Sequence, residues 1–329
     1  MVTFIITTYN LDDWLLCRCL DSIVAQGLPR DQYEVIVVDD ESAVSPQHVV
    51  DRYASFVDIA LHVQKHARQG AARNVGLRYA KGEWMQFVDG DDYLFPGALL
   101  PVLELAQAND LDLLMFGFRE VSSELLEKDT CRGSEKLLSP ITTGDEYMSC
   151  SNLFGVCWGQ IFKRQLLDDP MFGEPLRFTE GIFIEDEEFV TKLVWRAQRM
   201  AWTDFPVYAY YQRAGSTVNH RGREHADELF RNYFVVLERL LDFEAMIASK
   251  PHDGVTRKVR FLALDILRRA LREPDWRERW DKSVKRLNSL GLWPLPDARY
   301  SWKYDMFRLL GRCRGGRCAF RMIEKSKRL

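Results

Sequence analysis

Residues 84–92 read WMQFVDGDD, an apolar run that ends in a cluster of carboxylates. The run from Trp84 to Val88 predicts a buried strand. Three carboxylates then follow within four residues, where the strand reaches solvent. They repel one another unless a cation neutralises them, and Mg²⁺ or Mn²⁺ prefers oxygen ligands and leaves positions open for substrate phosphates. Gly90 permits a tight turn and the close approach of a ligand, so the segment is a candidate metal site.

This acidic segment has other interpretations. An EF-hand calcium loop would need Gly at its sixth position and Glu at its twelfth, where the chain has Leu94 and Leu100, so that interpretation fails. An aspartyl-phosphate phosphatase also has Asp-x-Asp after a strand, but normally on the first strand, with Thr or Val where Tyr93 stands. A solvated turn needs no chemistry, because Asp and Gly are common turn residues. The segment alone leaves the phosphatase and the turn open.

The sequence around this segment alternates short apolar runs with amphipathic stretches, which indicates a mostly parallel sheet covered by helices. The expected strands are residues 3–7, 33–38, 58–63, 84–88 and 111–118, and the expected helices are residues 12–26, 47–56, 70–80 and 97–109. Near-continuous apolar strands of this kind are buried on both faces. The expected fold class is therefore α/β.

Polar side chains follow three of these strands at the point where each strand ends. They are Thr7, Tyr9 and Asn10 after the first strand, Asp39 and Asp40 after the second, and Asp89 to Asp92 after the fourth. Ligands bind at the carboxyl ends of the strands in open sheets of this kind. The three clusters therefore predict one binding edge.

Beyond the fifth strand the sequence pattern changes. Residues 121–143 are polar, which predicts a long irregular excursion. A second apolar and aromatic block at 147–211 completes the main domain. From residue 223 onward apolar residues recur at i, i+3 and i+4, which predicts a C-terminal helical appendage.

Size and composition allow a full hydrophobic core. The 329 residues are 47% hydrophobic and 28% charged, as in an ordinary globular protein. No apolar run reaches the roughly 20 residues of a membrane span, and residues 2–7 begin a strand pattern without a signal peptide. Seven cysteines without repeated spacing fit a reducing compartment, and no second Cys/His pair completes a zinc site with Cys313 and Cys318. We therefore expect a cytoplasmic protein.

The last thirty residues differ in charge from the rest of the chain. Residues 300–329 hold nine Lys or Arg against Asp305 and Glu324, a net charge of +7; the whole chain has −3, so the remainder has −10. Apolar residues such as Trp302 and Met322 are mixed in, which suits peripheral contact with an anionic membrane at its inner, cytoplasmic face. A basic helix packed on the domain is the alternative. Nucleic acid is not expected as a partner, because the acidic remainder would repel phosphate.

Four N-terminal segments together resemble the inverting glycosyltransferases of family 2, which share the GT-A fold. They are FIITTYN at 4–10, YEVIVVDDES at 33–42, GAARNVGL at 70–77 and GEWMQFVDGDD at 82–92, in the family's order and spacing. A later segment, FIEDEEF at 183–189, is similar to the acidic segment that holds the family's catalytic base. The resemblance implies a GT-A domain over residues 1–220, with a nucleotide-binding part at 1–118 and an acceptor-side part at 141–220, before a helical C-terminal region at 221–329.

The resemblance implies a nucleotide site at the strand ends. It places Thr7 and Tyr9 beside the nucleotide and Asp40, with Asp39 as its neighbour, against the uracil. Arg73 would lie near the base or the phosphates. A carboxylate after a strand also caps helices, which is the alternative for Asp40. A surface ion pair is the alternative for Arg73.

In the acidic segment at 89–92, the resemblance makes Asp91 the metal ligand, while Asp89 supports it by touching ribose or a metal-bound water. A metal that bridges the phosphates stabilises the charge on the leaving nucleoside diphosphate. In the later segment, the resemblance makes Asp186 the base for the acceptor hydroxyl, with Glu185 in support. These carboxylates also suit the first turn of a helix, where negative charge is favourable.

Two further residues are implied on the acceptor and metal sides. Trp158, within VCWGQIFKRQLL at 156–167, stacks on an acceptor sugar or belongs to the core. Gln160 stands where relatives commonly carry Lys, which puts an inherited charge contact there in doubt. His220, within YYQRAGSTVNH at 210–220, completes a metal shell as a late His does in some GT-A enzymes, or is a surface residue.

The expected function is metal-dependent, inverting transfer of a sugar from a UDP-sugar or other nucleotide-sugar to a hydroxyl. The acceptor would be a glycan or a lipid-linked molecule in bacterial surface polysaccharide synthesis. The alternatives are an aspartyl-phosphate phosphatase and a non-catalytic nucleotide-binding protein on the same fold. Intact carboxylates in both acidic segments argue against the non-catalytic alternative.

Overall fold

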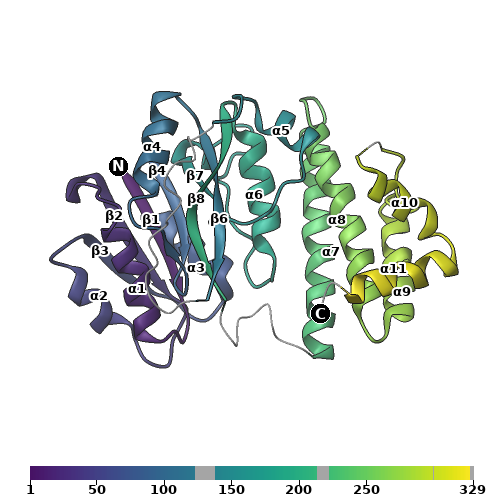
Figure 1. The fold of residues 1–329 in the computed structure, drawn as a ribbon, viewed down its shortest axis with the longest axis horizontal. Helices are drawn as coiled ribbons and strands as arrows, with labels where there is room; N and C mark the ends of the chain where they lie inside the picture. The colour runs from purple at the N-terminus through teal and green to yellow at the C-terminus, as the bar shows by residue number, and fades with distance from the viewer. Residues whose placement is uncertain (123–137, 213–221, 299, 327–329) are drawn as a thin grey trace. The chain divides into compact units, whose positions relative to one another are not determined.

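The computed structural model describes residues 1–122, 138–212, 222–298 and 300–326 (Figure 1). Contacts divide the chain into two compact units. One comprises Met1–Gly144 with Phe154–Gly222, and the other Asp145–Leu153 with Arg223–Leu329. The domain boundary between residues 220 and 221 and the division of the first domain into two parts stay predictions.

The first unit is built on one eight-stranded sheet. Its strands are β1 Val2–Thr8, β2 Tyr33–Asp39, β3 Asp58–Val63, β4 Trp84–Asp89, β5 Tyr93–Leu94, β6 Leu113–Val121, β7 Gln160–Lys163 and β8 Met200–Tyr211. They lie in the order β3-β2-β1-β4-β7-β6-β8-β5. The first four strands are parallel, β7 runs antiparallel to β4 and β6, and β8 is parallel to β6.

Helices flank this sheet, with η for short 3₁₀ turns. They are α1 Asp13–Val24, η1 Arg30–Gln32, α2 Gln47–Tyr53, α3 Arg68–Tyr79, α4 Leu99–Ala108, η2 Arg164–Leu167 and α6 Glu185–Arg196. The expected α/β class is confirmed. The expected helices at 12–26, 47–56, 70–80 and 97–109 correspond to α1 to α4, each within a few residues at its ends.

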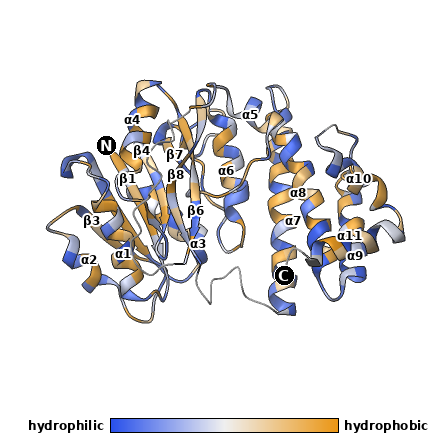
Figure 2. Cartoon of the chain, viewed as in Figure 1, coloured by the Kyte–Doolittle hydropathy of each residue, from blue (hydrophilic) through white to orange (hydrophobic). Residues whose placement is uncertain are grey.

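Side chains of β1 alternate between the two covered faces, as the period of a strand requires. Phe4 and Ile6 belong to the core cluster shared with α1 and α4. Ile5 points to the other face, where Gly76 lets α3 approach so closely that a Cβ there would lie 2.3 Å from Ile5. Figure 2 shows the resulting pattern, with strands coloured hydrophobic over most of their length.

The outer strand β3 corrects one expectation. Its residues are exposed or half-buried, although all five apolar runs were expected to be buried on both faces. Because β3 ends the sheet and pairs only with β2, it lacks a neighbour on its other side. The excursion expected at 121–143 lies mostly outside the described residues, but β6 extends to Val121 and Thr142 pairs with Met200.

The second unit is helical, as expected for the C-terminal region. Its helices are α5 Gly144–Cys150, which begins at the boundary residue, α7 Arg223–Met246, α8 Asp253–Arg272, α9 Trp276–Ser289, α10 Trp302–Leu310 and α11 Arg314–Ser326. Glu324 of α11 accepts hydrogen bonds from Arg268 and Arg272 of α8, and the rings of Phe307 and Phe320 lie 4.7 Å apart. Among the described residues, no helix is both long and apolar enough to span a membrane.

Candidate active site

Strand register places the three predicted polar clusters at one edge of the sheet. Thr7 pairs with Asp89 on one side of β1, and Thr8 pairs with Asp39 on the other. The N–H of Gly90 donates to the carbonyl of Thr7 at 3.1 Å. A Cβ on Gly90 would lie 2.9 Å from that oxygen, so the acidic turn requires glycine to stay this close to β1.

Arg73 brings the two acidic segments together. Its Nη2 donates to Oδ1 of Asp89 at 2.8 Å, and its Nη1 donates to Oε1 of Glu185 at 2.7 Å. The guanidinium is buried in α3, so it does not form the surface ion pair that was the alternative interpretation. Gly70, one turn earlier, leaves room for Glu185, because a Cβ there would lie 2.9 Å from the Glu185 Cγ.

The candidate base lies at the start of α6. The preceding residue, Ile184, adopts a left-handed conformation with φ 59°, which is strained for a β-branched side chain. Burial raises the pKa of Asp186 well above its usual range, and the charges of Glu185 and Glu187 add to that rise. Burial also raises the pKa of Glu185, although the neighbouring Arg73 opposes the rise.

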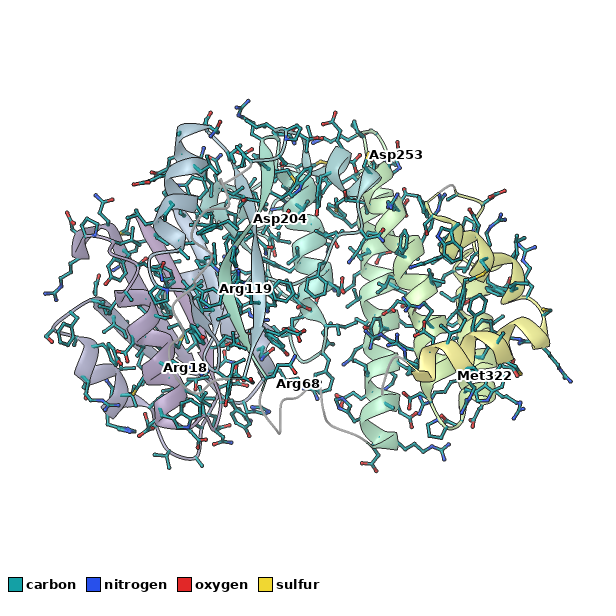
Figure 3. The ribbon with its side chains drawn as sticks, in the orientation of Figure 1. Arg18, Arg68, Arg119, Asp204, Asp253 and Met322 are labelled. Carbon is teal, nitrogen blue, oxygen red and sulfur yellow. The ribbon has the colours of Figure 1, made fainter. Side chains whose placement is uncertain are left out.

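Backbone strain gathers around the predicted binding edge. Among the described residues other than glycine, positive φ occurs at Asn10, Glu41, Arg68 and Ile184, in segments that follow β1 and β2 or begin α3 and α6, and at the more distant Asp110. Such conformations persist where surrounding structure fixes them, and they concentrate at functional sites. Figure 3 labels Arg68 and Arg18 toward the same end of the sheet, where β1 ends.

The carboxylates of Asp39 and Asp40 accept hydrogen bonds from other residues of the chain. Asp40 is buried and accepts hydrogen bonds from the N–H groups of Ala67 and Arg68, both at 2.9 Å, and from Gln64 at 2.6 Å. Asp40 thus caps the start of α3, which is the alternative given for it from sequence. Asp39 accepts from the hydroxyl of Ser42 at 2.5 Å. Their nucleotide-binding roles stay predictions.

Two predicted nucleotide contacts differ in exposure. Thr7 is nearly buried at the end of β1, whereas Tyr9 is 48% exposed. The Tyr9 ring stacks on the imidazole of His66 with centroids 4.4 Å apart. Nδ1 of His66 also lies 2.9 Å from an oxygen of Asp40. Through His66, the exposed ring of Tyr9 therefore lies close to Asp40, the predicted uracil contact.

Trp158 lies in the aromatic core, with 6% of its surface exposed. Its ring stacks on Tyr208 at 4.3 Å and meets the edge of Phe118 at 5.0 Å. Phe118 and Phe154 are the exposed members of this aromatic cluster, and their parallel rings lie 5.9 Å apart. Gln160 is buried and donates to the Cys157 carbonyl at 2.8 Å.

Sequence reasoning missed Asn74 and the partners of Asp92, both of which support the site. Asn74 donates to the carbonyl of Phe178 at 2.9 Å and accepts from its N–H at 2.8 Å, which fixes the loop before α6. Asp92 is buried and accepts from the Tyr208 hydroxyl and the Tyr211 N–H, both at 2.7 Å. Asn74 follows Arg73 directly in the GAARNVGL segment, which is the one signal that could have pointed to it.

No cluster of three or more His, Cys, Asp or Glu suited to a metal ion occurs in the part of the chain that the structure describes. Asp89 and Asp91 flank Gly90 in the acidic turn, and Asp91 is partly exposed. His220 lies outside the described residues. Cys313 and Cys318 are both exposed in the second unit.

Comparison with known proteins assigns the family. Residues 3–169, half of the chain, match the family model described as "Glycosyl transferase family 2". The chain belongs to this family. The match spans the four N-terminal segments and ends before the acidic segment at 183–189. The phosphatase interpretation of the acidic turn is therefore wrong.

Curated relatives of this family 2 chain are about one quarter identical to it. A poly(ribitol-phosphate) beta-glucosyltransferase of Bacillus spizizenii is 26% identical over 80% of the chain, which spans only 39% of that relative's length. The uncharacterized glycosyltransferase EpsJ of Bacillus subtilis is 25% identical over 83% of the chain and 86% of its own length. The uncharacterized glycosyltransferase YibD of Escherichia coli is 24% identical over 83% of the chain and 80% of its own length.

Solved structures share the fold of this family 2 chain. TarS residues 1–349 of S. aureus, in complex with UDP-GlcNAc, match with a TM-score of 0.69 and 20% identity, over 99% of this chain and 91% of that one. The mannosyltransferase PcManGT of Pyrobaculum calidifontis, in complex with GDP-Man and Mn²⁺, matches with a TM-score of 0.53 and 17% identity. The match covers 99% of this chain and 86% of that one. The expected GT-A architecture is confirmed.

Proposed function

We propose that the chain is a metal-dependent, inverting glycosyltransferase that moves a sugar from a UDP-sugar, or another nucleotide-sugar, to a hydroxyl of its acceptor. The observation that carries this proposal is the buried Arg73, whose guanidinium pairs with Asp89 and Glu185 at once. A direct displacement needs the donor and the base held in a fixed mutual position. One cation shared by both acidic segments supplies that restraint.

On the donor side, the nucleotide would be bound by residues gathered at the sheet edge. These are Thr7, Tyr9, Asp39, Asp40, Arg73 and Asp89. The exposed ring of Tyr9 offers a surface for base stacking. The UDP-GlcNAc held by TarS supports a uridine nucleotide as the first donor to test.

A divalent ion, Mn²⁺ or Mg²⁺, would be held by Asp91 with Asp89, and His220 stays a further candidate ligand. The acidic turn fits such an ion, because its carboxylate oxygens are hard ligands and an ion of this class keeps positions for water and phosphate oxygens. When bound, the ion would stabilise the charge that develops on the leaving diphosphate. The Mn²⁺ in PcManGT supports the choice of metal.

On the acceptor side, Asp186 would take the proton from the attacking hydroxyl. Burial raises its pKa, which makes its carboxylate a stronger base than that of an exposed Asp. Glu185 would hold the start of α6 in place through its ion pair with Arg73. Glu185 therefore supports the base rather than acting as one.

The acceptor would be a glycan or a lipid-linked molecule in bacterial surface polysaccharide synthesis. The relative that acts on poly(ribitol-phosphate) supports this class of acceptor. Trp158 would contribute by supporting Phe118 and Phe154, whose exposed rings suit stacking on a sugar. We further propose that the protein acts in the cytoplasm and that residues 300–329 make peripheral contact with an anionic membrane.

The proposal is tested first by ligand-induced stabilisation. A ligand that binds only the folded chain raises its melting temperature, by an amount that grows with its concentration over its Kd. UDP and UDP-sugars should raise the melting temperature with Mn²⁺ present, and Asp91→Ala should reduce that rise. The absence of any rise across uridine, guanosine and thymidine diphosphate donors would refute donor binding, and with it both the proposed transfer and the nucleotide-binding alternative.

A further inference from the structure

Arg18 is a second buried arginine beside the acidic turn, distinct from Arg73. It belongs to α1, and only 5% of its surface is exposed. Its guanidinium carbon lies 5.1 Å from the ring centroid of Trp14, 4.8 Å from that of Tyr93 and 4.2 Å from that of Tyr211. A cation in such an aromatic enclosure gains from the faces of the rings, but it has lost most of its water.

The guanidinium is directed at the main chain of the predicted metal ligand. Nη2 of Arg18 donates to the carbonyl oxygen of Asp91 at 2.8 Å. This hydrogen bond is made to the main chain of Asp91 and brings a positive charge to the acidic turn. Arg73 differs, because it pairs with the carboxylate of Asp89 itself.

The same turn is fixed from its other side by β8. Asp92 is buried and accepts from the hydroxyl of Tyr208 and from the N–H of Tyr211. The ring of Tyr211 is also the nearest of the three around Arg18. The peptide between Asp91 and Asp92 is thus fixed by Arg18 at its carbonyl and, through the next side chain, by the end of β8.

We propose that Arg18 is a positioning residue that sets the Asp91 carboxylate for the divalent ion and thereby determines how tightly the ion binds. This inference rests on the proposed function. A purely structural role is a poorer explanation, because a hydrophobic side chain would fill an enclosure of three rings without the cost of burying a charge. The charge and the hydrogen bond of Arg18 therefore act on the acidic turn that they contact.

The test measures Mn²⁺ binding directly, by electron paramagnetic resonance of the free ion during titration of the protein with UDP present. Arg18→Met keeps much of the apolar volume and removes the charge and the donor. It should weaken apparent Mn²⁺ binding about tenfold, since hydrogen bonds from charged donors are among the stronger ones. Arg18→Lys should recover part of the loss, and the melting temperature of both variants should stay within about 5 °C of wild type.

Arg30→Met is the matched control, because the exposed Arg30 also donates to a main-chain carbonyl, that of Ala54 at 3.2 Å. It should bind Mn²⁺ as the wild type does. Wild-type Mn²⁺ binding by both folded Arg18 variants would overturn the inference, as would a large fall in melting temperature with Mn²⁺ binding unchanged. Absence of Mn²⁺ binding in the wild-type protein would instead overturn the metal proposal, and this inference with it.

Discussion

At the scale of single residues, two buried arginines donate hydrogen bonds to the acidic turn. Arg73 pairs with the Asp89 carboxylate, and Arg18 donates to the Asp91 carbonyl. Neither arginine is near the turn in sequence, so the positive charges beside its carboxylates come from α3 and α1. Asp186 lies near the charges of Glu185, Glu187 and Arg73, and its Oδ1 accepts a hydrogen bond from the N–H of Glu187 at 3.0 Å.

The Asp186→Asn variant should lose transfer activity while gaining stability. Removing a general base costs about 10²- to 10⁴-fold in rate. Because burial raises the pKa of Asp186 above its unfolded value, the folded state holds the proton longer, and stability falls as pH rises from the unfolded pKa through the folded one. Asn does not titrate, so the variant does not lose this stability as pH rises. Its melting temperature should therefore exceed that of wild type at about pH 8.

Transfer measured against pH, together with melting temperature at each pH, checks both expectations. Asp204→Asn removes an exposed carboxylate at a distance in sequence from the acidic segments and should change neither quantity. Transfer by Asp186→Asn at the wild-type rate would show that another group is the base.

At the scale of elements, the site depends on how closely α3 packs against the segment that leads into α6. Gly70 lies in the first turn of α3, and a Cβ there would lie 2.9 Å from both the Glu185 Cγ and the Thr179 carbonyl. Asn74, one turn later, is bonded to Phe178 in the same segment. The start of α6, and with it Asp186, is therefore placed by α3 and not by its own helix alone.

The Gly70→Ala variant should separate these two elements. The added methyl should cost about 1–3 kcal/mol in the free energy of unfolding, because one partner is a main-chain carbonyl that does not move easily. Transfer activity should fall in the folded variant as well, since Glu185 must shift. Urea denaturation and steady-state kinetics measure the two effects.

Gly315→Ala is the control for the helical glycine itself. It lies in α11 with no atom within 4 Å of an added Cβ, so the change should be neutral or stabilising by up to about 1 kcal/mol. Equal stability of Gly70→Ala and the wild type would contradict the close packing described for α3.

At the scale of the whole molecule, the second unit presents an apolar and basic surface. On α11, Cys318, Ala319, Met322 and Ile323 follow one another at helical spacing and are exposed, with Met322 70% accessible (Figure 3). The opposite side of the helix buries Phe320 and Glu324. Exposed Lys303, Arg312 and Arg314 lie in the same stretch of the chain, and such a combination suits adsorption to anionic lipid.

Vesicle binding should depend on this α11 surface. The chain should sediment with vesicles of phosphatidylcholine and phosphatidylglycerol and be released at about 0.5 M salt, because surface charges are screened there. The double variant Met322→Glu, Ile323→Glu should bind at least tenfold less, since it removes apolar contact and adds negative charge. Met246→Glu, at an exposed apolar position of α7, is the control and should bind as wild type. Wild-type binding by the double variant would refute a role for this surface.

The sequence by itself determined the α/β class, the early strands and helices, the helical C-terminal region and the family. These follow from local periodicity and from short segments such as WMQFVDGDD, whose strand and turn are set by neighbouring residues. It also predicted that the polar clusters after β1, β2 and β4 would share an edge, because the ends of parallel strands meet there.

Tertiary structure alone decided which side chains pair within that edge. The bonds from Arg73 to Asp89 and Glu185, and from Arg18 to Asp91, join residues from different helices and loops, and periodicity carries no record of such pairs. It also placed Trp158 in the core, because Tyr208 from a later strand covers its ring. Charge compensation and burial depend on distances through space, so they became visible only when the chain was folded.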